Sequence, residues 1–272
     1  MIPGGLIKKS AYSEVTESRL FLELETYSDR FVELKKDLFP DFSKKWVKDS
    51  LHQWSRQYEY PFTAEALENC CPKSGRILDA GSGITFFPYY LKEKYPELAI
   101  ECCDTDHRLE EQFARVNGEL EQQVEYFDSD IRYIDRPEGF YDAVYCISVL
   151  EHTKDYGSII EELARITKPG GILVLTFDIS TDGSADIPFH TAVDLLSEVR
   201  RHYDQIPEKY DIEHKDLESE ELLTTGYIAS TDKKLLPWRY PYLMIFKTIA
   251  SGKIPKNFIR NLSCYCGIFK KK

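Results

Sequence analysis

Short apolar segments alternate with helical segments between Arg76 and Asp178, and this alternation limits the fold more than any other feature. Five strands are predicted there, at residues 76–80, 99–104, 124–127, 141–148 and 172–178. Strands that alternate with helices at this spacing form a parallel sheet with right-handed crossovers. With further strands predicted at 210–216 and 262–270, the sequence indicates an α/β fold with a mostly parallel, seven-stranded sheet and helices on both faces.

The sequence on either side of the alternation suggests additions to this sheet. Residues 12–55 show helical spacing of apolar residues, Pro61 is predicted to break the chain, and the segment between the last two strands is too long for a hairpin loop. Within that segment Trp238, Tyr240 and Tyr242 could stack on a ring or sugar face. The predicted units are a helical N-terminal cap (1–69), the sheet domain (70–216), an inserted substrate cap (217–261) and the last strand (262–272).

Composition excludes several classes of function. The formal net charge of -11 opposes binding to nucleic acid, which needs a basic face. The chain has no apolar run of about 18 residues and no apolar signal segment near its start, so we expect a cytoplasmic protein without a membrane span. Seven cysteines without a CxxC pair favour reduced thiols over disulfides or zinc. The sequence does not determine the oligomeric state.

The segment ILDAGSGIT (77–85) places a strand, an acid and a Gly-x-Gly turn before a helix. Gly81 and Gly83 allow a tight turn and a close approach of the backbone to a ligand. Asp79 lies two residues before the first glycine, where it would repel a pyrophosphate but attract an ammonium group. The incomplete GxGxxG fingerprint therefore disfavours a nicotinamide oxidoreductase.

Four further motifs follow in order. They are Asp104 at the end of the second strand, Asp130-Ile131 after the third, FYDAVYCISVLEH (140–152), and LARITKPGGILVLT (163–176). Together with the glycine turn, these motifs resemble class I S-adenosylmethionine-dependent methyltransferases over residues 74–178. The resemblance implies a Rossmann-like fold and S-adenosylmethionine as cofactor. Thr85 departs from the family pattern, because many members have a third glycine there.

The resemblance assigns roles to the residues around the cofactor. Asp79 would hold the ammonium of the methionine part, and Gly81 and Gly83 would line the homocysteine and ribose. Asp104, with Thr105 beside it, would accept hydrogen bonds from both ribose hydroxyls.

On the adenine side of the cofactor, the resemblance implies that Asp130 accepts from the amino group and that Ile131 covers the ring. Ile147 and Ser148 would run beside the sulfonium. Arg56, in the upstream segment WSRQYEYPF (54–62), could face the methionine carboxylate.

Glu151 and His152 follow the fourth strand, where an acceptor should arrive. His152 is the best-placed base for a hydroxyl acceptor, whereas an amine needs only its neutral form. Alternatively, these two residues orient each other or cap the next helix. Some relatives carry Glu-x-x-Glu-His here and bind a divalent ion, but Ser148 replaces the first Glu, so we expect no metal.

The residues of the motifs, including TFDIS (176–180) at the end of the fifth strand, resemble those of bacterial small-molecule and surface-glycan methyltransferases. The sequence hypothesis is therefore methyl transfer to a hydroxyl of a small molecule, such as a sugar or nucleotide-linked sugar. Two alternatives stay open: an N-methyltransferase acting on a small amino metabolite, and a catalytically silent module that only binds S-adenosylmethionine.

Overall fold

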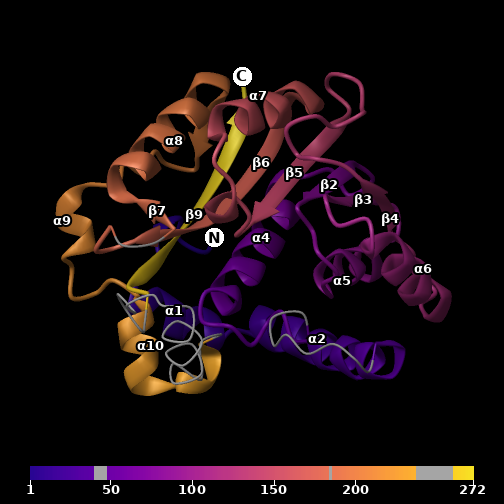
Figure 1. The fold of residues 1–272 in the computed structure, drawn as a ribbon, viewed down its shortest axis with the longest axis horizontal. Coiled ribbons are helices and arrows are strands. Elements are labelled where there is room, and N and C mark those ends of the chain that lie inside the picture. The colour runs from indigo at the N-terminus through magenta and orange to yellow at the C-terminus, as the bar shows by residue number, and fades with distance from the viewer. Residues whose placement is uncertain (40–47, 184–185, 237–259) are drawn as a thin grey trace, which may run out of the picture.

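The computed structural model describes residues 1–39, 48–183, 186–236 and 260–272, and one twisted sheet forms its centre (Figure 1). In this part of the chain the strand order is β1-β9-β6-β5-β2-β3-β4, with β7 beside β6 and β8 beside β9. The strands are β1 (Gly5–Leu6), β2 (Arg76–Ala80), β3 (Ala99–Asp104), β4 (Glu125–Asp128), β5 (Tyr141–Ile147), β6 (Thr167–Ser180), β7 (Ile187–Pro188), β8 (Tyr203–Ile206) and β9 (Leu262–Lys271).

The direction of the strands identifies where a ligand should bind. Strands β2 to β7 pair in parallel, whereas β9 runs antiparallel to β6, and β1 and β8 run antiparallel to β9. From β2 the chain first adds β3 and β4 on one side and then returns to add β5 and β6 on the other. In such sheets ligands bind beyond the carboxyl ends of the strands at this reversal, which lies between β2 and β5.

Helices cover both faces of the sheet, because alternate residues of the buried strands point in opposite directions. Ile77 and Tyr145 contribute to a core with α2, α4, α5 and α6, whereas Leu78 and Val144 contribute to a second core with α7 and α8. The helices are α1 (Lys9–Thr16), α2 (Arg19–Leu38), α4 (Arg56–Cys70), α5 (Phe87–Lys94), α6 (Leu109–Glu119), α7 (Tyr156–Ile166), α8 (Phe189–His202), α9 (His214–Leu217) and α10 (Thr225–Thr231), with short 3₁₀ helices η1 (Leu150–His152) and η2 (Lys233–Leu235).

The structure confirms the predicted α/β class and corrects three local predictions. The predicted strand 210–216 is wrong, because β8 pairs with β9 in its place and a capping box of Glu213 and Asp216 starts helix α9. The predicted break at Pro61 is also wrong: α4 continues through it, because both sides of this helix are buried and packing outweighs the lost hydrogen bond. Finally, the N-terminal region is not helical throughout, since β1 joins the sheet.

Some predictions fall outside the described residues. The aromatic side chains of the predicted cap, Trp238, Tyr240 and Tyr242, are among them, as are residues 43–47 of the helix expected from about Ser43 to Trp54. Residues 49–54 are described and are not helical, so that part of the prediction is wrong. In the described part of the chain, no helix combines the length and the apolar character needed to cross a bilayer.

Candidate active site

Two adjoining cavities open at the carboxyl ends of the central strands. The first has a volume of about 590 Å³ and the second about 560 Å³. Both are lined by Gly81, Asp104, Ser148 and His152, which therefore mark the passage from one cavity to the other. The cavities thus lie at the predicted reversal of the strand order.

The glycine turn after β2 brings the backbone close to the neighbouring strand end. Gly81 has a φ of +77°, and a Cβ placed there would come within 2.7 Å of the Val149 side chain. Gly83 also has a positive φ, of +52°, but a Cβ there would meet no heavy atom within 4 Å. The turn therefore requires glycine conformations and leaves open space beside Gly83 for a ligand.

Asp104, the last residue of β3, has a carboxylate held by the backbone. One oxygen accepts from the Gly83 N–H at 3.0 Å, and the other accepts from the Asp106 N–H at 3.2 Å. A carboxylate has about four lone-pair sites, so both oxygens retain capacity for two ligand hydroxyls. This geometry fits the predicted ribose contact, with Thr105 lining the second cavity next to it.

Asp79 at the end of β2 is a buried acid in the first cavity. Burial raises its pKa to about 8, helped by the charge of Asp104 and opposed by the phenol of Tyr145. A cation arriving beside Asp79 would stabilise the ionised carboxylate and return the pKa toward its ordinary range. The site therefore suits the ammonium group that the family resemblance assigns to it.

The second cavity contains the residues predicted to contact adenine. Ile131 is buried, and its side chain lines this cavity with Asp130. The Asp130 carboxylate is bound by Arg132 through Nε at 3.0 Å and Nη2 at 2.5 Å, and this contact lowers its pKa. An amino group would therefore share Asp130 with Arg132.

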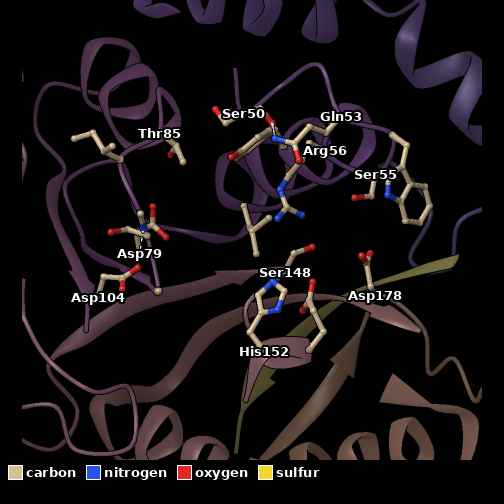
Figure 2. A pocket seen from close by; sticks show the side chains of 18 of the residues that line it. Ser50, Gln53, Ser55, Arg56, Asp79, Thr85, Asp104, Ser148, His152 and Asp178 are labelled. Atoms are coloured by element: carbon tan, nitrogen blue, oxygen red, sulfur yellow. Dashed lines mark hydrogen bonds between the residues drawn. The ribbon is translucent and has the colours of Figure 1, made fainter. Parts of the chain in front are cut away.

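At the inner end of the first cavity, Arg56 enters from α4 and points toward the strand ends (Figure 2). Its Nη1 donates to Glu59 Oε2 at 2.5 Å. The other oxygen of Glu59 accepts from Ser148 Oγ at 2.7 Å and from Thr176 Oγ1 at 2.5 Å. Arg56 thus faces the cavity as predicted, but with a buried counter-ion that the sequence analysis did not identify.

Two more acids at this end have buried oxygens without a hydrogen-bond partner among the described residues: Glu151 Oε2 and Asp178 Oδ1. Burial raises the pKa of Glu151 to about 8 and that of Asp178 well above its usual range. Figure 2 shows the Asp178 carboxylate directed into the pocket, on the side opposite Asp79 and Asp104. Leaving such oxygens unpaired is costly, so the arrangement favours a ligand with donor groups.

Asp186 extends this group of acids. Its Oδ1 pairs with Arg260 at 2.8 Å, whereas Oδ2 is buried and has no partner in the described part of the chain. Asp186 and Ser148 also share a φ of +48°, which is costly for residues other than glycine and often occurs at functional sites. Both line the first cavity.

His152 lies in η1 at the junction of the two cavities. It is exposed, and partial desolvation lowers the pKa of its imidazole. The ring is therefore neutral at physiological pH and able to accept a proton.

The structure brings the predicted residues together in two groups. Arg56, Asp79, Gly81, Gly83, Asp104, Ile147, Ser148, Glu151 and His152 line the first cavity, and Thr105, Asp130 and Ile131 line the second. The sequence analysis did not identify Glu59, Asp178 or Asp186. Asp178 is the last residue of the predicted strand 172–178, so the strand-end rule that selected Asp104 would also have selected it. Among the described residues, no three His, Cys, Asp or Glu side chains form a group suited to a metal ion.

The donor set fits S-adenosylmethionine. Asp104 offers acceptors to ribose hydroxyls, the buried Asp79 suits an ammonium, and Gly83 leaves space between them. Arg56 supplies a cation at the end where the methionine carboxylate is expected.

Comparisons with known proteins agree with this fit. The sequence model of a methyltransferase domain matches residues 78–175. A dimethylglycine N-methyltransferase from Parasynechococcus marenigrum is 23% identical over 203 residues, covering 63% of this chain and 71% of that protein. A demethylmenaquinone methyltransferase from Deinococcus radiodurans is 28% identical over 41% of this chain, and a ubiquinone biosynthesis O-methyltransferase from Xanthomonas oryzae is 35% identical over 37%. The chain spans less than half the length of these last two relatives, at 46% and 42%.

Solved structures show the same fold at low sequence identity. A protein from Galdieria sulphuraria, described as a sarcosine dimethylglycine methyltransferase, has a TM-score of 0.55 and 17% identity, with 90% of this chain and 98% of that chain covered. The cyclase SpnF has a TM-score of 0.50, 16% identity, and coverage of 80% and 82%. A cyclase shares the fold, so the fold alone does not define the reaction. Residues 78–175 match the methyltransferase domain family, and the motifs and the cavity of this region are those of class I S-adenosylmethionine-dependent methyltransferases.

Proposed function

We propose that this protein transfers the methyl group of S-adenosylmethionine to an amino group of a small, polar molecule. The observation that carries the proposal is the pair of acids Glu151 and Asp178 beside the expected methyl-donor site, each with one buried oxygen that has no hydrogen-bond partner among the described residues. Burial raises the pKa of both acids, which favours their protonated forms as long as no cation is near. A cationic amine would pair with both acids and would stabilise their ionised forms.

The polarity of the cavity supports a small polar acceptor over an isoprenoid or sterol. Some relatives are named for quinone or sterol substrates, which are large and apolar. Most of the residues that line the first cavity have polar or charged side chains. A hydrocarbon chain bound against these side chains would leave them without hydrogen-bond partners. The polar lining residues include Ser50, Gln53, Ser55, Arg56, Glu151, Asp178, Asp186 and Arg260.

The chemistry requires that the acceptor lose a proton. When bound, S-adenosylmethionine supplies a methyl group on a positively charged sulfur, which leaves as a neutral thioether. An ammonium has no lone pair, so it must first give its proton to a base. Glu151, with its pKa raised to about 8, holds such a proton far better than an ordinary glutamate. The ammonium displaces the protons of Glu151 and Asp178 to solvent as it binds, and the ionised carboxylates then keep the amine close to the methyl carbon. Glu151 takes up the proton that the nitrogen releases before it attacks the methyl carbon.

The relatives are consistent with an amine, since the dimethylglycine N-methyltransferase aligns with the larger part of this chain. A hydroxyl acceptor, as the sequence hypothesis favoured, is the second candidate. The observation that favours it is the neutral imidazole of His152 at the junction of the cavities. For a hydroxyl, His152→Ala should lower turnover by about 10²–10⁴-fold, whereas an amine should lose much less.

The test compares matched amine and hydroxyl acceptors with S-adenosylmethionine, with methylated products identified by mass spectrometry. Asp178→Asn should raise the KM of the amine at least about tenfold, because a charge-assisted hydrogen bond contributes about 1.5–3 kcal/mol. The KM of S-adenosylmethionine should stay close to that of the wild type. Asp204→Asn is the control, since this aspartate is exposed on β8.

Methylation of the hydroxyl compounds alone would overturn the proposal in favour of O-methyl transfer. Binding of S-adenosylhomocysteine with no transfer to either set would favour the silent binding module.

A further inference from the structure

Glu59 of α4 is a buried carboxylate that lies behind the cavity wall. Its side chain is fully buried, and it accepts hydrogen bonds from three side chains on three elements. Arg56 lies one turn earlier on α4, Ser148 follows β5, and Thr176 is in β6. Glu59 therefore connects the N-terminal helical region to two strand ends of the active site.

The contact with Ser148 acts on the turn that carries Glu151 and His152. Ser148 has a φ of +48°, a conformation that costs about 1–3 kcal/mol for a residue other than glycine. Its N–H donates to the Thr176 carbonyl at 3.0 Å, and its hydroxyl donates to Glu59. The next turn, η1, starts two residues later. Glu59 thus helps to hold the strained residue from which this turn departs.

The contact with Arg56 fixes a cation at the cavity surface. Burial opposes the ionisation of Glu59, but the charge of Arg56 and the hydroxyls of Thr176 and Ser148 outweigh it and lower the pKa of Glu59. An ionised Glu59 then keeps the Arg56 guanidinium in one place, with its remaining N–H groups available to the cavity. The ion pair of Arg56 and Glu59 is therefore a fixed part of the wall of the first cavity.

We propose that Glu59 is a positioning residue for methyl transfer, which holds Arg56 and the Ser148–His152 turn toward the cavity without contacting either substrate. This inference rests on the proposed function, because it assigns the bound proton to Glu151 and Asp178. It also has a consequence that is independent of any acceptor. The negative charge of Glu59 raises the pKa of both Glu151 and Asp178.

The groups that act on Glu151 and Asp178 come from several elements. Arg56 lowers the pKa of both acids, and the charge of Glu151 raises the pKa of Asp178. The charged and titratable groups that face the pair are Arg56, Glu59, Asp186, Cys146, Cys264 and Cys266. Among these, Glu59 can be neutralised by one isosteric substitution, Glu59→Gln.

The first measurement is the pH dependence of the melting temperature without acceptor, between pH 6 and pH 8. A raised pKa in the folded state means that stability is lost as the pH rises toward 8. Glu59→Gln should lower the pKa of Glu151 and Asp178 and make this loss smaller than in the wild type. Glu68→Gln is the matched control, because Glu68 is an exposed glutamate of the same helix and should leave the slope unchanged.

The second measurement is turnover as a function of pH. We expect Glu59→Gln to reduce kcat by about tenfold or more and to move its midpoint to lower pH, while Glu59→Asp keeps the midpoint because it keeps the charge. Ser148→Ala should also reduce kcat, but it should make the stability slope steeper than in the wild type, because the Ser148 hydroxyl lowers the pKa of Glu151.

The outcomes separate the two proposals. If Glu59→Gln and Glu68→Gln show equal stability slopes and the midpoint does not move, Glu59 has only a structural role and the inference is wrong. If no amine is methylated by the wild type, the proposed function fails, but the stability slopes still test the action of Glu59 on the acid pair.

Discussion

The carboxylates at the two ends of the cleft differ in their hydrogen-bond partners and in their burial. At the ribose end, Asp104 has both oxygens held by backbone N–H groups. Asp79, next to Asp104, is buried, whereas Glu151 and Asp178 at the inner end are half-buried, and desolvation raises the pKa of all three acids. The first arrangement is complete before a ligand arrives, whereas the second becomes complete only with a cation. The contrast suggests that neutral hydroxyls are recognised at one end and positive charges at the other.

The largest expected effect concerns the ribose end. Asp104→Ala would remove the two charge-assisted contacts predicted to the ribose and should weaken S-adenosylhomocysteine binding by about 100-fold. Isothermal titration calorimetry at pH 6 and pH 8 measures this loss. Asp106→Ala is the control, because the half-buried carboxylate of Asp106 pairs with Arg108. A loss that changed strongly with pH would contradict the contrast, since it would place a titrating group at the ribose.

A smaller effect is expected from Asp79. The folded protein holds a proton on this acid up to about pH 8, and the ligand ammonium favours the ionised form. The affinity for S-adenosylhomocysteine should therefore rise by about tenfold from pH 6 to pH 8, as binding displaces that proton. Methylthioadenosine, which lacks the amino-acid part, is the matched ligand and should show a flat profile. Equal profiles for the two ligands would mean that Asp79 does not face the ammonium.

The smallest effect is on stability. The pKa of Glu151 is about 8 in the folded state and lies in the usual range when the chain is unfolded. The unfolded chain therefore releases this proton at lower pH, and the wild type loses stability as the pH rises toward 8. Glu151→Gln lacks this loss, so its melting temperature should fall by about 4 °C less between pH 6 and pH 8. Differential scanning fluorimetry measures both proteins. A wild type and variant with parallel curves would show that Glu151 is not protonated in the fold.

The same contrast explains which parts of the site the sequence could predict. Asp79 and Asp104 were identified because each belongs to a local pattern of strand, acid and turn. Asp178 ends the predicted strand 172–178, so the rule that selected Asp104 would also have selected it. The role of Glu59 depends on the path of α4 above the strands, and spacing along the chain does not carry that information. Arg56 was assigned to the right cavity, but its partner became apparent only when α4 was seen to continue through Pro61.

The fold, like the site, has parts that the sequence predicts and parts that it does not. The alternation from Arg76 to Asp178 predicted the central strands because each is a buried run of the right length. The strand β8 was missed because it continues directly from the helix α8, and its assignment depends on pairing with β9 more than 50 residues later. Antiparallel partners that are distant in sequence leave little local signal.

The pairing of β1 with β9 has a consequence for how the site forms during synthesis. Leu6 lies opposite Tyr265, so the first strand can find its partner only after nearly all of these residues have left the ribosome. The Tyr58 hydroxyl donates to the Pro3 carbonyl, which links the same N-terminal segment to the helix that carries Arg56 and Glu59. The central strands can assemble as they emerge. The N-terminal segment that supports α4, and with it the inner end of the first cavity, is held in place only after β9 has been made. In a nascent chain, the end of the cleft with Asp104 would therefore form first, and the inner end with Arg56 and Glu59 would form last.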